Sequence, residues 1–304
     1  MTAARSIEVI GVPFNSAGLT NGVARAPAAL RAAGLIDEIR MVGIDVEDHG
    51  DVSLGATAAQ RDPASHVIAP DALESMIRTV GPRVAASLIR GAFPLVVGGD
   101  CPILLGCLAG LLAHQSSCGL VFVDGHEDAY PPDRSPSGEA ADMELGFALG
   151  LTDAALPPDL RDAIPRLRFE DVVVLGPRDQ AELRESGIET LEGRLAYLAS
   201  GAVAADPAAA AAEAAARMAP LSSWWLHVDL DVLATASLAA GDYPQPGGLD
   251  WDGLGQLCAA ALADPGVAGW DITIYNPDLD PDGSAAERIT VFIAEALRLG
   301  QPGS

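Results

Sequence analysis

Short apolar runs alternate along the chain with longer stretches rich in alanine and leucine. Strands that are apolar throughout and separated by helix-length segments are typical of a parallel sheet covered by helices on both faces. The pattern therefore predicts an α/β fold with one layer of seven or eight strands. The runs are IEVIGV at 7–12, MVGIDV at 41–46, FPLVVGG at 93–99, GLVFVDG at 119–125, DVVVLG at 171–176, WWLHVDLDV at 224–232 and VAGWDITIY at 267–275.

The length of the chain and the position of its loops predict a single domain over residues 1–304. A chain of 304 residues can bury one large core, and no internal repeat is visible. Two segments rich in proline and glycine, 130–138 and 241–249, follow predicted strands, which indicates loops and not linkers. The alanine-rich tract at 206–220 is typical of a helix in water, and no apolar stretch is long enough to cross a membrane.

The charge and the cysteine content of the chain limit which partners it can bind and in which cell compartment we expect it. The chain has 42 acidic and 18 basic side chains, a formal net charge of −24, which repels nucleic acid and anionic lipid. Its four cysteines form no CxxC pair and are too few for a disulfide scaffold, so we expect reduced thiols. The apolar run near the N-terminus is too short for a signal peptide. These features predict a cytoplasmic protein without nucleic-acid or membrane partners.

Two acidic motifs follow predicted strands. The first is Asp124-Gly-His126-Glu-Asp128, and the second is Asp229-Leu-Asp231 with His227 two residues earlier. Residues two apart on an extended segment face the same way, and ligands bind beyond the carboxyl ends of parallel strands. Aspartate is also common at strand ends as a turn former, which is the alternative explanation. Because grouped carboxylates repel each other without a cation, a divalent metal site is the stronger hypothesis.

The same motifs carry a resemblance to a known family. Four segments resemble, in order, the signature segments of the arginase and agmatinase, or ureohydrolase, superfamily. They are GGDCPILLG at 98–106, DGHEDAY at 124–130, HVDLDVLA at 227–234 and WDITIYNPDLD at 270–280. The resemblance also includes the segments 10–35 and 241–251, and it spans about residues 7–282.

This resemblance implies a three-layer α/β/α sandwich around a mostly parallel sheet of about eight strands, as in arginases. It implies two divalent ions, usually manganese, whose bridging hydroxide attacks a guanidinium carbon and releases urea and an amine. By the same resemblance Asp124 and Asp229 would bridge the ions. His126 and Asp231 would complete the coordination of one ion, and Asp128 would be a ligand of the other. A homo-oligomer, trimer or hexamer, is implied as well.

The sequence departs from the family at three functional positions. Cys101 replaces a histidine ligand on the Asp128 side, Ala141 stands for a catalytic histidine, and Ile274 stands for a glutamate that pairs with the guanidinium. A thiolate ligand would favour zinc, cobalt, iron or nickel over manganese. Cys101 could instead be a buried inert thiol beside a single metal, or a covalent nucleophile. Loss of the glutamate removes a charge-assisted acceptor for a cationic substrate.

Other residues are weaker candidates for the site. His227 could compensate as a ligand, a hydrogen-bond partner or a proton relay, or it could be a core histidine bonded to a backbone carbonyl. Acids that we expect to be exposed or to order loops are Glu127, Glu139, Asp142 and Glu144. Candidates for substrate contacts, all of which loop structure alone could also explain, are Asn15, Tyr130, Ser137, Arg178 and Asp179. Cysteines expected in the core are Cys107, Cys118 and Cys258.

We therefore expect a metal-dependent hydrolase that cleaves a non-peptide C–N bond in a linear amidine or guanidino small molecule. Its metal ligands would be Cys101, Asp124, His126, Asp128, Asp229 and Asp231, and its catalytic residues Asp128 and His227. The altered positions argue against ordinary arginase activity and favour a different or less basic substrate. Two alternatives stay open. One is a catalytically silent ligand-binding or structural subunit, and the other is a deacetylase-like amide hydrolase with one zinc on Asp124, His126 and Asp229.

Overall fold

A single sheet forms the middle of the molecule. The computed structural model describes residues 5–55, 58–152 and 155–301. Within them, eight strands pair in parallel in the order β2-β1-β3-β8-β7-β4-β5-β6. This confirms the predicted sheet. The strands are β1 (Ile7–Val12), β2 (Val46–Asp51), β3 (Phe93–Gly98), β4 (Gly119–Val123), β5 (Val172–Leu175), β6 (Ala196–Leu198), β7 (Trp224–Asp229) and β8 (Val267–Thr273).

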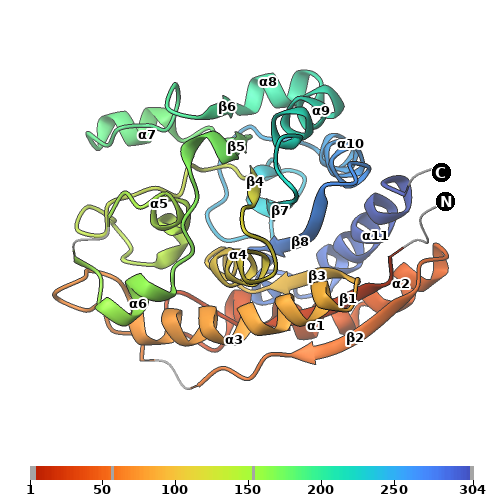
Figure 1. The fold of residues 1–304 in the computed structure, drawn as a ribbon, viewed down its shortest axis with the longest axis horizontal. Coiled ribbons are helices and arrows are strands. Elements are labelled where there is room, and N and C mark those ends of the chain that lie inside the picture. The colour runs from red at the N-terminus through yellow and green to blue at the C-terminus, as the bar shows by residue number, and fades with distance from the viewer. Residues whose placement is uncertain (1–4, 56–57, 153–154, 302–304) are drawn as a thin grey trace.

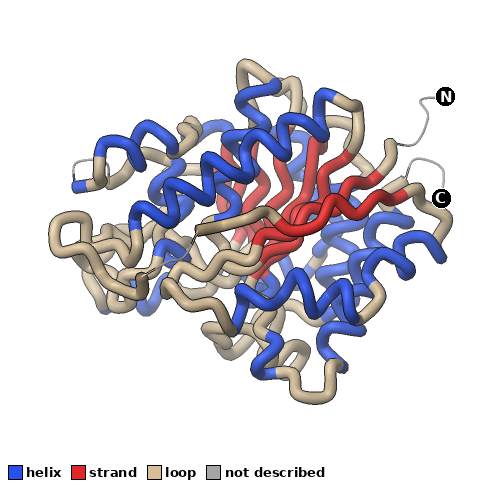
Figure 2. The backbone as a smooth tube through the Cα atoms, turned by 90° about the horizontal axis from the view of Figure 1, so that it is seen from below, coloured by secondary structure: helices blue, strands red, loops and turns tan. Residues whose placement is uncertain are grey.

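Helices cover both faces of the sheet and complete the three layers (Figures 1 and 2). One face packs against α1 (Ala26–Ala32), α2 (Leu35–Met41), α8 (Ser200–Ala205), α9 (Pro207–Met218), α10 (Trp251–Leu262) and α11 (Ser284–Leu299). The other packs against α3 (Pro70–Ile89), α4 (Ile103–His114), α5 (Glu144–Ala148), α6 (Pro158–Ala163) and α7 (Gln180–Glu185). Within the described ranges we find no helix whose length and hydropathy would let it span a bilayer.

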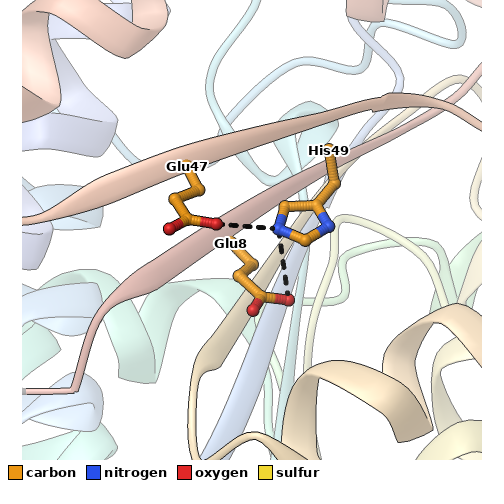
Figure 3. A group of neighbouring side chains, drawn as sticks. All are labelled: Glu8, Glu47 and His49. Carbon is orange, nitrogen blue, oxygen red and sulfur yellow. Dashed lines mark ion pairs between the residues drawn. The ribbon is translucent and has the colours of Figure 1, made fainter.

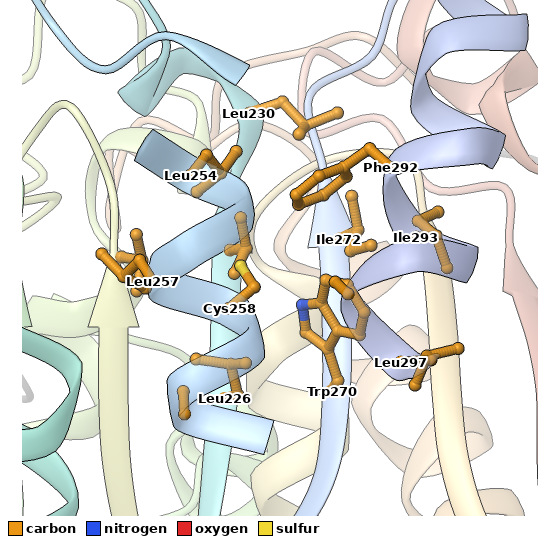
Figure 4. Close-up of a cluster of buried hydrophobic side chains, with 14 of the residues drawn as sticks. Leu226, Leu230, Leu254, Leu257, Cys258, Trp270, Ile272, Phe292, Ile293 and Leu297 are labelled. Carbon is orange, nitrogen blue, oxygen red and sulfur yellow. The ribbon is translucent and has the colours of Figure 1, made fainter. Parts of the chain in front are cut away.

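The central strands are buried on both faces, which explains their continuous apolar sequence. On β7, Trp225 faces one core and the next residue, Leu226, faces the other. Figure 4 shows the second of these cores, where Trp270 of β8 lies between α10 and α11 beside Cys258. Parallel strands covered by helices need apolar side chains at successive positions for this reason. All four cysteines are free and buried, and burial was predicted for Cys107, Cys118 and Cys258.

The two edge strands are where the pattern of apolar runs fails. The run at 41–46 was expected to be a strand, but Met41 ends α2 and Gly43 turns the chain with φ 85°. Strand β2 begins only at Val46 and is mostly polar, because an edge strand has solvent beside it and fewer neighbours to bury. At the opposite edge, β6 has only three residues, and no apolar run marked it.

The carboxyl ends of four adjacent strands, β3, β8, β7 and β4, meet at one edge of the sheet. The loops that follow them therefore lie side by side, which is where open parallel sheets bind ligands. The loop after β3 packs directly on the loop after β1. A Cβ atom at Gly99 would lie 2.1 Å from the carbonyl oxygen of Phe14, so only glycine allows this approach. This contact fixes the position of Cys101.

Candidate metal centre

Asp124 lies at the centre of the candidate site. It follows β4, is fully buried, and its Oδ1 accepts a hydrogen bond from the His126 amide at 2.7 Å. Ligand atoms of Asp124, His126 and Asp128 lie within 4.8 Å of one another. Asp128 reaches this position through left-handed backbone, φ 42°, and not through the alternation of an extended segment. The D-x-H-x-D motif therefore converges, but by way of a turn.

The D-x-D motif after β7 joins the same centre. Asp229 and Asp231 form a second group with Asp124, again with ligand atoms within 4.8 Å of one another. Asp231 accepts a hydrogen bond from the Gly125 amide at 3.0 Å, and its Oδ2 lies 2.8 Å from His126 Nδ1. The structure thus brings the aspartates and the histidine of both motifs together.

A third group, which the sequence analysis missed, combines Asp124 with Glu144 and His227. Glu144 begins α5 and is 0 % exposed, so the expectation of an exposed or loop-ordering acid is wrong for it. Its only signal was its place in the segment where the family carries a catalytic histidine. His227 is also 0 % exposed, and its Nδ1 lies 2.6 Å from Asp271 Oδ2, so its partner is a carboxylate and not a backbone carbonyl.

Burial and mutual repulsion control the protonation of these acids. Burial raises the pKa of Asp128, Asp229 and Glu144 well above the usual range, and neighbouring carboxylates raise it further. The pKa of Asp231 is raised by burial too. Asp124 differs from the other acids. Burial alone would raise its pKa, but the imidazoles of His126 and His227 hold the pKa below the usual range. The centre thus gathers five carboxyl groups that resist ionising together.

The residues present fit a divalent cation. Among the described residues, four buried polar atoms at the centre have no hydrogen-bond partner: Asp124 Oδ2, Glu144 Oε1 and Oε2, and His227 Nε2. Unpartnered buried polar atoms are costly, and a cation would satisfy them while relieving the repulsion between carboxylates. Carboxylate oxygens combined with imidazole nitrogens suit transition ions such as manganese, iron, cobalt and zinc.

Cys101 lies beside the centre as a buried thiol. It is 2 % exposed, and its Sγ donates a hydrogen bond to Asp229 Oδ2. Burial raises the pKa of Cys101 well above its usual value, and the charge of Asp229 raises it further. This environment disfavours the thiolate, which is the reactive form of a cysteine nucleophile.

A cavity of about 280 Å³ opens beside the centre. The predicted residues that line it are Cys101, His126, Asp128, Tyr130, Ser137, Asp179, Asp229 and Asp231. The lining also includes Glu139, Asp142 and Glu182, and no arginine is among the lining residues that the structure describes. The cavity wall is therefore acidic. A larger hollow of about 560 Å³ lies elsewhere, beside the start of α3, and holds none of the candidate metal groups.

Four predicted site residues, Asp124 among them, do not line this cavity. The Asn15 amide bonds Asn21 O and Ala17 N in its own loop, and Asn15 lines a neighbouring hollow. Arg178 Nη2 donates to the backbone oxygen of Asp231 at 2.6 Å, so it supports a loop. His227 lies behind the cavity wall, and a direct catalytic contact between its ring and a substrate is therefore not supported.

Ala141 and Ile274 both line the cavity, at the positions where the resemblance places a histidine and a glutamate. Ile274 has φ 71°, which is an outlier for a β-branched residue. Its amide donates to the Gly99 carbonyl oxygen at 2.9 Å, which ties the loop after β8 to the loop after β3. Strained backbone beside a cavity is typical of functional positions.

A separate cluster of Glu8, Glu47 and His49 could also be considered for metal binding (Figure 3). His49 Nε2 lies 3.6 Å from Glu8 Oε2 and 3.4 Å from Glu47 Oε2. Glu8 is already bound by the guanidinium of Arg90 and by Ser87, and the Arg90 hydrogen bond lowers its pKa. Because its carboxylate is already neutralised, we do not treat this cluster as a metal site.

Without metal, the free energy of unfolding should fall as pH rises from about 4 to about 7. Burial raises the pKa of Asp179 to about 7, although the charge of His126 opposes it, and burial raises that of Asp142 to about 6. Such a carboxyl keeps its proton in the folded state after the unfolded chain has lost it. Its stabilisation is therefore complete below the unfolded pKa and is lost as pH rises through the folded pKa.

Denaturant titrations in chelator at several pH values measure this dependence. Asp179→Asn should make it less steep, whereas Asp252→Asn, at an exposed position on α10, should leave it as in the wild type. An equal pH dependence in the wild type and the Asp179 variant would contradict the prediction.

Comparison with known proteins places the chain in a family. It belongs to the Arginase family, whose model matches residues 5–298, and this confirms the resemblance. An arginase from Bacillus caldovelox is 34% identical over 191 residues, which cover 61% of this chain and 64% of that relative, less than two thirds of its length. A solved structure of Bacillus caldovelox arginase has a TM-score of 0.82 at 26% identity and covers 97% of this chain and 98% of that one. Formimidoylglutamase from Bacillus subtilis, 17% identical, shares the fold with a TM-score of 0.70 and covers 97% and 87% of the two chains.

Proposed function

We propose that this protein is a metal-dependent hydrolase of a non-peptide C–N bond in a linear amidine or guanidino compound. The observation that carries the proposal is the convergence of two acidic motifs, with unpartnered buried ligand atoms, at the wall of an acidic cavity. Divalent ions bound there would supply Lewis-acid activation of water and of the substrate carbon. Membership in the Arginase family supports this reaction class.

The chain's own residues would position the substrate and move protons. Asp128 lines the cavity, where its carboxylate can take up a proton from the attacking water and return it to the leaving amine. Asp179 and Glu182 line the same cavity and can pair with a cationic tail. At the reacting end Ile274 offers no acceptor, so we infer a head group less dependent on a carboxylate than the guanidinium of arginine.

The resemblance and the ligand chemistry lead to three further proposals. We infer two divalent ions, with manganese favoured by the resemblance and with zinc, cobalt, iron or nickel open through Cys101. We also propose a homo-oligomer, trimeric or hexameric, and a cytoplasmic location. Each follows from family likeness or composition, and metal analysis and sedimentation of purified protein test the first two directly.

A substrate panel tests the function. Purified protein is analysed for metal, stripped with chelator, reloaded with manganese, cobalt, nickel or zinc, and incubated with guanidino and amidine compounds while urea and ammonia are measured. We expect metal-dependent release from a substrate that carries a cationic tail. Binding of a substrate analogue without turnover under every metal would favour the silent-subunit alternative. One zinc per chain, with amide hydrolysis, would favour the deacetylase-like alternative.

A further inference from the structure

We propose that Asp124, Glu144 and His227 form a buried divalent-metal position, and that it takes the place of the position which the family builds on residue 101. This inference rests on the proposed function, because Asp124 is a ligand both in the proposed catalytic centre and in this buried position. It assigns ligand roles to two side chains, Glu144 and His227, for which the resemblance implies no such role. The expected occupant is a transition ion, because the set contains an imidazole nitrogen as well as carboxylate oxygens.

The geometry of the three ligand atoms carries the first step. They lie within 4.8 Å of one another, and His227 Nε2 is 3.9 Å from Asp124 Oδ2. Two atoms bound to one ion at about 2.0–2.2 Å are separated by about 3 to 4 Å. The spacing therefore already accommodates an ion with only small side-chain movements.

The unsatisfied state of these atoms carries the second step. Both Glu144 oxygens, Asp124 Oδ2 and His227 Nε2 lack a hydrogen-bond partner among the described residues, and all three side chains are 0 % exposed. Buried carboxylates and imidazoles nearly always find partners, so a group of orphaned atoms that face one another indicates an absent ligand. Bulk water does not reach the atoms to satisfy them.

The surroundings of His227 carry the third step. Its Nδ1 lies 2.6 Å from Asp271 Oδ2, and Asp271 Oδ1 accepts a hydrogen bond from Trp225 Nε1 at 2.5 Å. The ring stacks on Phe122 with centroids 4.7 Å apart and an interplanar angle of 21°. A carboxylate on Nδ1 favours a proton on that nitrogen, which leaves Nε2, on the side of Asp124, as the nitrogen available to a cation; this is the arrangement typical of metal-binding histidines.

The absence of a histidine at position 101 explains why another imidazole would be needed as a metal ligand. Cys101 is a neutral thiol that donates to Asp229, while His227 brings an imidazole to the other side of Asp124. Glu144 adds a carboxylate next to Asp128, and two carboxylates in contact must share either a proton or a cation. The competing explanation is therefore a shared proton, with His227 as an imidazolium between Asp124 and Asp271.

Metal stoichiometry and affinity of the full chain separate these explanations. Glu144→Gln keeps the shape of the side chain and removes its charge, and His227→Asn removes the imidazole. The matched control is Glu127→Gln, an equally buried glutamate whose oxygens are bound by the Leu191 amide and the Tyr197 hydroxyl. We expect the control to bind as many manganese or cobalt ions as the wild type. Each test variant should lose one ion or bind it at least about 10- to 100-fold more weakly.

A cobalt spectrum gives a second readout that does not depend on activity. In the cobalt-loaded wild type, the exchangeable Nδ1 proton of a coordinated His227 should give a shifted proton resonance. This signal should persist in Glu127→Gln and disappear in His227→Asn. Circular dichroism confirms that each variant is folded, and Glu144→Gln provides the test if His227→Asn is not.

The outcomes distinguish this inference from the function on which it rests. If the wild type binds divalent metal and both test variants bind it with unchanged stoichiometry and affinity, the buried position is wrong and the proposed function stands. If the wild type binds no divalent metal, both are wrong. If the cobalt-shifted His227 resonance is absent from a loaded wild type, the imidazole is not a ligand and the shared-proton explanation holds.

Discussion

Asp124→Asn is expected to abolish tight divalent-metal binding and, with it, catalytic activity. Asp124 is the one residue common to all three candidate groups, so no other single side chain affects as many ligand sets. An amide in its place carries no charge to balance a cation and offers one oxygen where a bridging carboxylate offers two. Loss of metal affinity should exceed the 10- to 100-fold effect typical of a group that only supports a ligand.

Thermal unfolding with and without metal, together with analysis of the bound metal, tests this prediction. Metal at 100 times its Kd stabilises the wild type by about 2.7 kcal/mol and raises the Tm. The Asp124 variant should show no metal-dependent rise. The control is Asp171→Asn, which removes a buried aspartate just before the amino end of β5, whereas the centre lies at the carboxyl ends of the strands; Asp171 pairs with Arg168. A normal metal-dependent rise in the Asp124 variant would exclude it from the centre.

The fold was predictable from the sequence because six of the eight strands are buried runs with apolar residues on both faces. Burial leaves a sequence record, and the edge strands lack one: β2 is polar and β6 is only three residues long. A helix was also predictable where its composition is distinctive. The alanine-rich tract became α9, and Asp206 caps it by accepting a hydrogen bond from the Ala209 amide.

The site was predictable only as far as its residues are close in sequence. Asp124, His126 and Asp128 share one loop, so their spacing alone suggested a ligand set. The partner of His227 depends instead on strand register, because His227 of β7 lies directly opposite Asp271 of β8. Glu144 reaches the centre only through the packing of α5, which no local pattern encodes. These long-range contacts are what turned His227 from a possible core histidine into a candidate ligand.

Cys101 gives the second large expected effect. If the thiol is a neutral neighbour of the metals, Cys101→Ser should keep the wild-type metal stoichiometry, because a hydroxyl can also donate to Asp229. Cys101→His should behave differently, because it returns an imidazole to the cavity side of the centre and leaves His227 in place. We expect manganese to bind about 10- to 100-fold more tightly in Cys101→His, with a smaller gain for zinc, which already binds well to mixed ligand sets.

Competition titrations of manganese against zinc in the wild type and both variants test this prediction. A histidine is larger than a cysteine at a 2 % exposed position, so circular dichroism and the Tm must first show that the variant is folded. Loss of one ion in Cys101→Ser would show that the thiol itself is a ligand. It would also contradict the assignment of that ion to Glu144 and His227. Unchanged metal preference in a folded Cys101→His would contradict this prediction and would show that a side chain at position 101 does not reach a metal.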